Sequence, residues 1–301
     1  MDNFKVSKIK AITQLTELYV KEKPKIVGCD TESTGLHIMR DKPFVITLGW
    51  VNLENKVIYV GSFDLEQDYI AVRSLFDKFS RDDVTIVAWN VKYDMHMLAN
   101  IEFDVMQNKW FDGIALVRLT TASDSNMKLG LKPVASKYFG EESSALDKLV
   151  KTILTQLRKD RFKKIDAELK QYGLDTKEIL KMYENQEYLE DIDDIISKYP
   201  EPNYSDVPRE IMLDYADNDV VIMLKYLVLA TPYINLRDQQ KILQEETALI
   251  KPLWEKERTG LKVDIQYLEE SKQRVKGYLD FLREKLHNLA GTTFTVSGDT
   301  L

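Results

Sequence analysis

The sequence has little cysteine and little histidine. Cys29 is its one cysteine, and the three histidines lie far apart among 301 residues. One cysteine cannot form a disulfide within the chain or supply a zinc site, so a reducing cytoplasm is the expected location. Cys29 lies inside an apolar stretch, so we expect it to be a small residue of the hydrophobic core.

Long apolar runs and an excess of positive charge are also missing. No apolar run approaches the ~20 residues that span a bilayer, and the N-terminal MDNFKVSKIKAITQ lacks the apolar core of a signal peptide. We therefore expect no membrane partner. The net charge of -7 argues against a protein that coats nucleic acid by bulk electrostatics. It leaves room for an enzyme that grips a few nucleotides around metal ions.

What is present alternates between strand and helix patterns, which predicts an α/β fold with a mixed β-sheet flanked by helices. A short edge strand is expected at 4–8 and a buried strand at 84–89. The three strands between them form an antiparallel meander. The meander strands are expected at 25–32, 44–51 and 56–60, and helices at 9–21, 67–79 and from 91 onward. The second of these helices turns Ile70, Leu75, Phe76 and Phe79 inward.

The second half of the sequence predicts helices. Their expected ranges are 113–120, 131–139, 208–229, 239–260 and 265–290. Residues 141–206 are heavily charged and are interpreted as an insertion. Segment 148–170 holds eight Lys/Arg and three Asp/Glu, and segment 182–206 holds one Lys and eight Asp/Glu. Two solvent-exposed helix faces are the favoured explanation, and a basic helix that touches a substrate's phosphates is the alternative.

Asp30 and Glu32 end the first long strand, in KIVGCDTESTGL. Side chains alternate along a strand, so the two carboxylates point the same way and repel each other unless a cation lies between them. A hard divalent cation is the usual partner of such a pair. The Asp-x-Glu tripeptide is common, however, and a solvent-exposed strand end is the favoured explanation when it stands alone.

Two further segments supply carboxylates. Asp94 follows Asn90 where a buried strand meets a helix, at the kind of strand end where α/β sheets place their sites, although an Asp there is often only a helix-start residue. Tyr215 and Asp219 are four residues apart and share one helix face, and that face continues as apolar side chains. Asp217 falls on another face, which we expect to be solvated.

Four carboxylates from three segments can form a two-metal site that cleaves phosphodiesters. Oxygen ligands without a Cys or His cluster favour magnesium or manganese over zinc. Tyr215 is placed to orient the attacking water, and Leu36 to lean over whatever occupies the site.

These three segments together resemble the motifs of the DEDD superfamily of 3′–5′ exonucleases. Asp30 and Glu32 match its first motif, Asn90 and Asp94 its second, and Tyr215 and Asp219 the Tyr-x-x-x-Asp of its third. The resemblance is to the tyrosine branch, because the histidine branch would need a His at position 214, which is Asp. Within that branch the chain looks most like the proofreading domain of family A (DNA polymerase I-like) DNA polymerases.

The resemblance implies a ribonuclease-H-like fold and removal of nucleotides from single-stranded or frayed DNA 3′ ends. It implies two divalent cations, Mg²⁺ or Mn²⁺, with Asp30, Glu32 and Asp219 on the tighter ion and Asp94 acting on the second. Ser33, Leu36 and Asn90 would contact the terminal nucleotides. The expected setting is the cytoplasm of a bacterial cell or phage-infected host.

The resemblance also predicts the domain organisation. Residues 1–236 would form the exonuclease domain, with the insertion at 141–206. Residues 237–301 would be the start of a small all-α polymerase thumb, on the strength of EETALIKPLWEKERTGLKVD and FTVSGD. No palm or fingers motifs follow, so we expect no polymerase activity, and a polymerase domain or subunit is the expected partner. The alternatives are an RNA-trimming enzyme of the ribonuclease D type and a non-catalytic module that holds a polymerase on DNA.

Overall fold

A computed structural model describes residues 4–121, 128–140, 145–176, 179 and 190–292. The chain divides into two compact units, Met1–Glu255 and Lys256–Leu301. The FTVSGD motif and part of the charged insertion lie outside the described residues.

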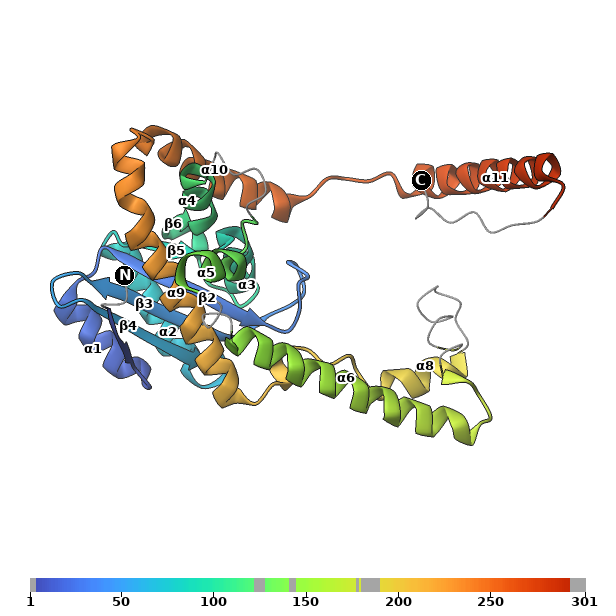
Figure 1. The fold of residues 1–301 in the computed structure, drawn as a ribbon, viewed down its shortest axis with the longest axis horizontal. Helices are drawn as coiled ribbons and strands as arrows, with labels where there is room; N and C mark the ends of the chain where they lie inside the picture. The colour runs from blue at the N-terminus through green and yellow to red at the C-terminus, as the bar shows by residue number, and fades with distance from the viewer. Residues whose placement is uncertain (1–3, 122–127, 141–144, 177–178, 180–189, 293–301) are drawn as a thin grey trace. The chain divides into compact units, whose positions relative to one another are not determined.

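The first unit is built on a six-stranded mixed sheet (Figure 1). Its strand order is β1-β4-β3-β2-β5-β6, with β2, β3 and β4 as the predicted antiparallel meander and with β1, β5 and β6 joined by parallel pairing. The strands are β1 (Lys5–Lys8), β2 (Ile26–Ser33), β3 (Pro43–Asn52), β4 (Val57–Asp64), β5 (Thr85–Ala88) and β6 (Lys109–Asp112). The sequence patterns missed β6, whose Lys-Trp-Phe-Asp shows neither alternation nor a longer apolar run.

Helices cover both faces of the sheet and continue beyond it. Before the insertion they are α1 (Ile12–Glu22), α2 (Leu65–Arg81), α3 (Val91–Ala99), α4 (Gly113–Thr120) and α5 (Leu131–Phe139). The rest are α6 (Ala145–Gln171), α8 (Glu190–Ser197), α9 (Arg209–Leu236), α10 (Gln240–Thr259) and α11 (Ile265–Ala290), with short 3₁₀ turns at Val105–Gln107 and Tyr204–Asp206. The mixed sheet flanked by helices is the predicted ribonuclease-H-like fold, and a helical segment follows it.

The alternation of β2 divides its side chains between two apolar layers. Val27 and Cys29 face the core formed with α1, α2 and α3, and Cys29 is fully buried as expected. Gly28 faces α9, where an added Cβ would lie 3.0 Å from Met223 and 3.1 Å from Val220. The absence of a side chain there lets α9 lie close against the sheet, on the same face of β2 as Asp30 and Glu32.

Two details of the helices differ from expectation. Ile70 is 81% exposed, because α2 turns Val72, Phe76 and Phe79 to the core and leaves Ile70 on its outer side. Helix α9 does not end near residue 229 but continues through Pro232, which lies on an exposed side of the helix. By length and composition alone α9 could cross a membrane, a criterion that the buried core helix of a globular protein also meets.

The charged insertion forms a small apolar cluster of its own. Ile165 and Leu169 of α6 pack with Ile195 and Ile196 of α8. Its opposite charges pair across the segment: Arg161 lies 3.0 Å from Glu201. In the described part of the insertion, some of the charged side chains therefore stabilise the segment by pairing with each other, as well as facing solvent.

The division into compact units falls inside α10. Ile250 and Trp254 of this helix are buried in the main core, so the first unit extends past residue 236. Helix α11, in the second unit, has no buried residue. The assignment of residues 237–301 to the start of a polymerase thumb stays a prediction.

Candidate active site

Strand β2 and helix α9 bring three carboxylates together. Asp30, Glu32 and Asp219 each offer an oxygen within 4.8 Å of the other two. Glu32 and Asp219 are buried, and Asp30 is partly buried. Of the carboxylates predicted from the sequence, these three form the compact cluster.

Asp94 lies on the other side of β2. Its Oδ1 accepts hydrogen bonds from the backbone N–H of Thr31 (2.9 Å) and from the Thr31 hydroxyl (2.7 Å). Thr31 stands between Asp30 and Glu32 and points to the opposite face of the strand. Asp94 is 2% exposed, in the first turn of α3 as expected. It is fixed beside the cluster without joining the three-oxygen group.

Burial raises the pKa of the four carboxyl groups Asp30, Glu32, Asp94 and Asp219. Burial is the main cause for Asp30 and Glu32, and their neighbouring carboxylates add to it. Burial also raises the pKa of Asp94 to about 7, against the lowering effect of the Thr31 hydrogen bonds. Buried carboxylates of this kind require a cation or protons.

Tyr215 lies one turn before Asp219 on α9 and is 7% exposed. A hydrogen bond from Tyr215 lowers the pKa of Asp219, opposing the effect of burial. Burial and the nearby carboxylates raise the pKa of the Tyr215 hydroxyl far above its ordinary value. The hydroxyl is therefore a neutral hydrogen-bond donor and acceptor at the edge of the cluster.

Ser33 is the last residue of β2, Leu36 lies in the loop after it, and Asn90 lies between β5 and α3. Leu36 is 84% exposed, in a loop that Tyr93 holds by donating a hydrogen bond to the Gly35 carbonyl (2.7 Å) and by contacting the Ser33 hydroxyl. Asn90 is exposed and takes a left-handed backbone conformation (φ 66°) just before α3. The loop is anchored, and its apolar tip remains available.

The donor set fits a hard divalent cation. Oxygen atoms alone meet in the cluster, and magnesium, manganese and calcium prefer such ligands. The site therefore fits the metal ions that 3′–5′ exonucleases generally use.

Comparison with known proteins is in line with this geometry. A family model for the 3′–5′ exonuclease domain of the DNA polymerase A type matches residues 5–229. The chain belongs to this exonuclease family. It is thus a 3′–5′ exonuclease by family, and the match includes all three carboxylate segments and the insertion.

Individual relatives are more distant. The exonuclease is 24% identical over 266 residues to DNA polymerase DpoZ of Salmonella phage PMBT28, covering 88% of this chain and 36% of the polymerase. The chain thus spans about a third of the length of that relative. The POL domain of Pol1 from M. smegmatis has a similar fold, with a TM-score of 0.57, 11% identity and coverage of 97% of this chain and 38% of that one. NrnC of Brucella melitensis matches with a TM-score of 0.48 and 13% identity, and the match covers 85% of this chain and 94% of the NrnC chain.

Lys132 is a residue of the candidate site that sequence reasoning missed. It is the second residue of α5, its ammonium forms an ion pair with Asp219, and its Nζ lies 4.2 Å from the centre of the Tyr215 ring. Its charge lowers the pKa of Asp30 and Glu32 as well. The surrounding LKPVASKYF shows only helical spacing, so the sequence carried no signal for this role.

The insertion also reaches the exonuclease site. The ring of Tyr204 stacks on Tyr215 with centroids 6.4 Å apart, and Val150 and Leu154 of α6 pack in the same apolar cluster as Tyr215. The base of the insertion therefore forms a wall of the site, which the sequence analysis left without a role.

Asp217 differs from its prediction. It is 6% exposed and accepts a hydrogen bond from Ser62 (2.7 Å), while Lys8 lies 3.3 Å away. The predicted separate face of α9 is real, but it packs against the sheet and not against water.

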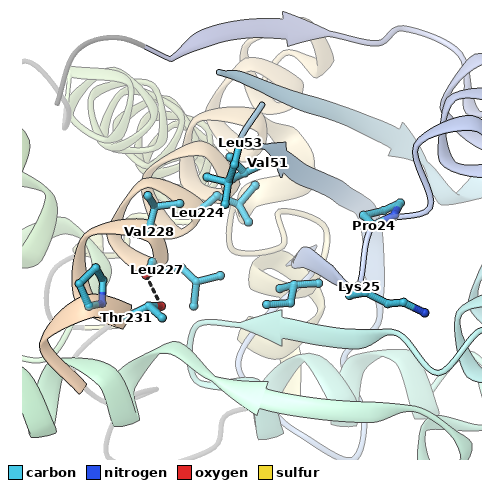
Figure 2. A pocket seen from close by; sticks show the side chains of 10 residues that line it. Pro24, Lys25, Val51, Leu53, Leu224, Leu227, Val228 and Thr231 are labelled. Atoms are coloured by element: carbon cyan, nitrogen blue, oxygen red, sulfur yellow. Dashed lines mark hydrogen bonds between the residues drawn. The ribbon is translucent and has the colours of Figure 1, made fainter. Parts of the chain in front are cut away.

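An apolar hollow of the exonuclease lies away from the carboxylates (Figure 2). Ile26, at the start of β2, lines it together with Leu224 and Val228 of α9. Asp30 and Glu32 lie toward the other end of β2, so this hollow shares no residue with the cluster.

Proposed function

We propose that the chain is a divalent-metal-dependent 3′–5′ exodeoxyribonuclease of the proofreading type. It hydrolyses phosphodiester bonds at single-stranded or frayed DNA 3′ ends. The observation that carries this proposal is the convergence of Asp30, Glu32 and Asp219 oxygens within 4.8 Å, with the Tyr215 hydroxyl beside them. The family membership supplies the reaction and its direction.

The residues of the proposed site have different roles. Asp30, Glu32 and Asp219 would hold the tighter ion, and Asp94 would act on a second ion directly or through water. The metal ions, when bound, supply an activated water and stabilise charge on the scissile phosphate. Tyr215 orients the attacking water through its hydroxyl, which its raised pKa keeps protonated at neutral pH.

Leu36, Ser33 and Asn90 would hold the terminal nucleotides. Leu36 presents an exposed apolar side chain from a loop fixed by Tyr93. A residue that wedges against the last bases needs such a side chain in a fixed position. The Ser33 backbone and Asn90 would contact the terminal nucleotides as well. Stacking and backbone contacts of this kind read shape more than base identity.

DNA is the favoured substrate because of the relatives. DpoZ is named a DNA polymerase, and the Pol1 structure holds a DNA primer-template. We infer from these that the chain acts beside a polymerase domain or subunit. The phage origin of DpoZ favours the cytoplasm of an infected bacterial host.

Digestion of a 5′-labelled single strand, with and without Mg²⁺, tests metal dependence, polarity and substrate together. We expect a ladder of products shortened from the 3′ end only when Mg²⁺ or Mn²⁺ is present. An RNA strand of the same sequence should be degraded more slowly. Faster cleavage of RNA would favour a ribonuclease D-like role.

Asp30→Ala ties the activity to the cluster. We expect it to lower the rate by about a thousandfold while the protein stays folded. Asp77→Ala, an exposed acid on α2, is the matched control and should behave as wild type. Near-normal hydrolysis by Asp30→Ala in Mg²⁺ would disprove the proposed site.

A further inference from the structure

Lys132 is a positive side chain that contacts the carboxylate cluster. Its Nζ forms an ion pair with Asp219, one of the three residues that meet there. The side chain is 21% exposed and that of Asp219 is 9% exposed. A lysine ammonium thus lies beside buried acids that are expected to bind a dication.

The position of Lys132 is fixed by the packing of α5. Val134 and Ala135 are fully buried, and Val134 packs with Tyr226 of α9. Just before the helix, the Leu129 carbonyl accepts a hydrogen bond from the Trp89 indole (3.0 Å). The helix therefore directs Lys132 toward the residues of α9 that belong to the site.

The charge of Lys132 acts on the cluster as a whole. It lowers the pKa of Asp30, Glu32 and Asp219, in opposition to burial. A dication among the same oxygens would be repelled by an ammonium only a few ångströms away. Lysine has a flexible four-carbon stem, so the ammonium can move while α5 stays in place.

We propose that Lys132 is a built-in counter-cation of the metal site. Its ammonium neutralises Asp219 in the metal-free protein and gives up this carboxylate when a divalent cation binds. The released ammonium remains over the electron-rich face of Tyr215, a favourable cation–π position. This inference rests on the proposed function, because it takes the cluster to be the metal site.

The consequence is a competition that can be measured without substrate. Lys132→Met removes the competing charge, so Mn²⁺ should bind about tenfold more tightly. The same variant should unfold several degrees lower in EDTA, since the buried carboxylates lose their counter-charge. If Lys132 instead oriented Asp219 for the metal, its removal would weaken Mn²⁺ binding.

Isothermal titration with Mn²⁺ and thermal unfolding in EDTA test this on the full chain. Lys132→Gln is a second neutral variant, able to keep a hydrogen bond to Asp219, and should also bind Mn²⁺ more tightly. Lys132→Arg keeps the charge and should remain within about threefold of wild type. Lys137→Met removes an exposed charge from the same helix and should leave Mn²⁺ affinity unchanged.

The outcomes separate this inference from the proposed function. Wild-type Mn²⁺ binding, with equal or weaker binding by Lys132→Met and Lys132→Gln, overturns the counter-cation and leaves the exonuclease site standing. A wild-type protein that binds no Mn²⁺ contradicts the proposed function itself. Tighter binding by both neutral variants supports the counter-cation.

Discussion

At the scale of single residues, the Tyr215 hydroxyl is separable from the rest of its side chain. The ring packs with Tyr204 and the apolar base of the insertion, while the hydroxyl acts on Asp219, whose pKa it lowers. Tyr215→Phe keeps the ring. We expect the hydrolysis rate to fall roughly a hundredfold, with Mn²⁺ affinity and melting temperature close to those of wild type.

Tyr233→Phe is the matched control for this change, because Tyr233 lies on the same helix and is 50% exposed. It should leave the rate unchanged. A Tyr215→Phe enzyme as fast as wild type at saturating Mg²⁺ would show that the hydroxyl does not position the water.

The raised carboxyl pKa values predict how the metal-free protein responds to pH. Burial raises the pKa of Asp94 from 3.8 to about 7 in the folded chain. Between these values the folded chain holds a proton that the unfolded chain has lost, so the free energy of unfolding falls as pH rises. The pKa values of Asp30, Glu32 and Asp219 are raised as well and act in the same direction.

Urea unfolding in EDTA at several pH values between 5 and 8 measures this slope. Wild type should be more stable at pH 5 than at pH 7, and Asp94→Asn should flatten the dependence. With Mn²⁺ present the slope should reverse, because metal ligands must be deprotonated. Stability that increases with pH in EDTA would contradict the carboxyl pKa values.

How much of this site was predictable differs from residue to residue. Asp30 and Glu32 share a face because strands alternate, and Tyr215 and Asp219 because helices repeat, so spacing alone placed each pair. Lys132 was missed because its approach to Asp219 depends on how two distant helices pack. Asp217 was assigned to the wrong environment. Helical periodicity shows that Asp217 lies on a different face of α9 from Asp219, but it does not show whether the sheet or water covers that face.

At the scale of elements, Asp217 joins α9 to the sheet behind the site. The Ser62 hydroxyl bonds to Asp217 and to Thr47, each at 2.7 Å, and Thr47 stands directly opposite Asp30 across β2 and β3. Lys8 of β1 lies 3.3 Å from Asp217. This polar chain helps to fix the position of α9, which carries Asp219 and Tyr215.

Asp217→Ala should lower the free energy of unfolding by about 1–3 kcal/mol, because it leaves the Ser62 hydroxyl without this acceptor. Asp214→Ala on the same helix also removes a partner of Lys8, but the Asp214 side chain is 59% exposed. That change should cost less than about 1 kcal/mol. Equal losses in the two variants, measured by urea unfolding, would refute the special role of the buried acid.

The order of the elements was largely predictable from periodicity, including the meander and the strand before α3. Strand β6 was missed because its sequence, KWFD, neither alternates nor forms an apolar run like that of β5. The end of α9 was misplaced because Pro232 usually stops a helix, yet here it lies on an exposed side. Local sequence signals thus predicted most of the elements. They failed where the pattern was too weak, as in β6, or where the tertiary environment set the end of a helix, as in α9.

At the scale of the whole molecule, the end of the first unit determines where the chain can be shortened. Ile250 and Trp254 of α10 are 6% and 9% exposed and belong to the main core, and Trp254 stacks on His96 with centroids 5.5 Å apart. The Lys251 ammonium donates a hydrogen bond to the Met106 carbonyl (2.6 Å). A shortened protein therefore needs most of α10.

A protein of residues 1–260 should keep the exonuclease rate of the full chain, because α11 contributes no buried residue. A protein of residues 1–236 loses Ile250 and Trp254, and deleting buried side chains of this size costs about 2–5 kcal/mol each. We expect the shorter protein to melt at a clearly lower temperature, and Trp254→Ala in the full chain to reproduce part of that loss. Equal melting temperatures for the two shortened proteins would show that the folded unit ends at residue 236, where the sequence motifs place the domain boundary, and not inside α10.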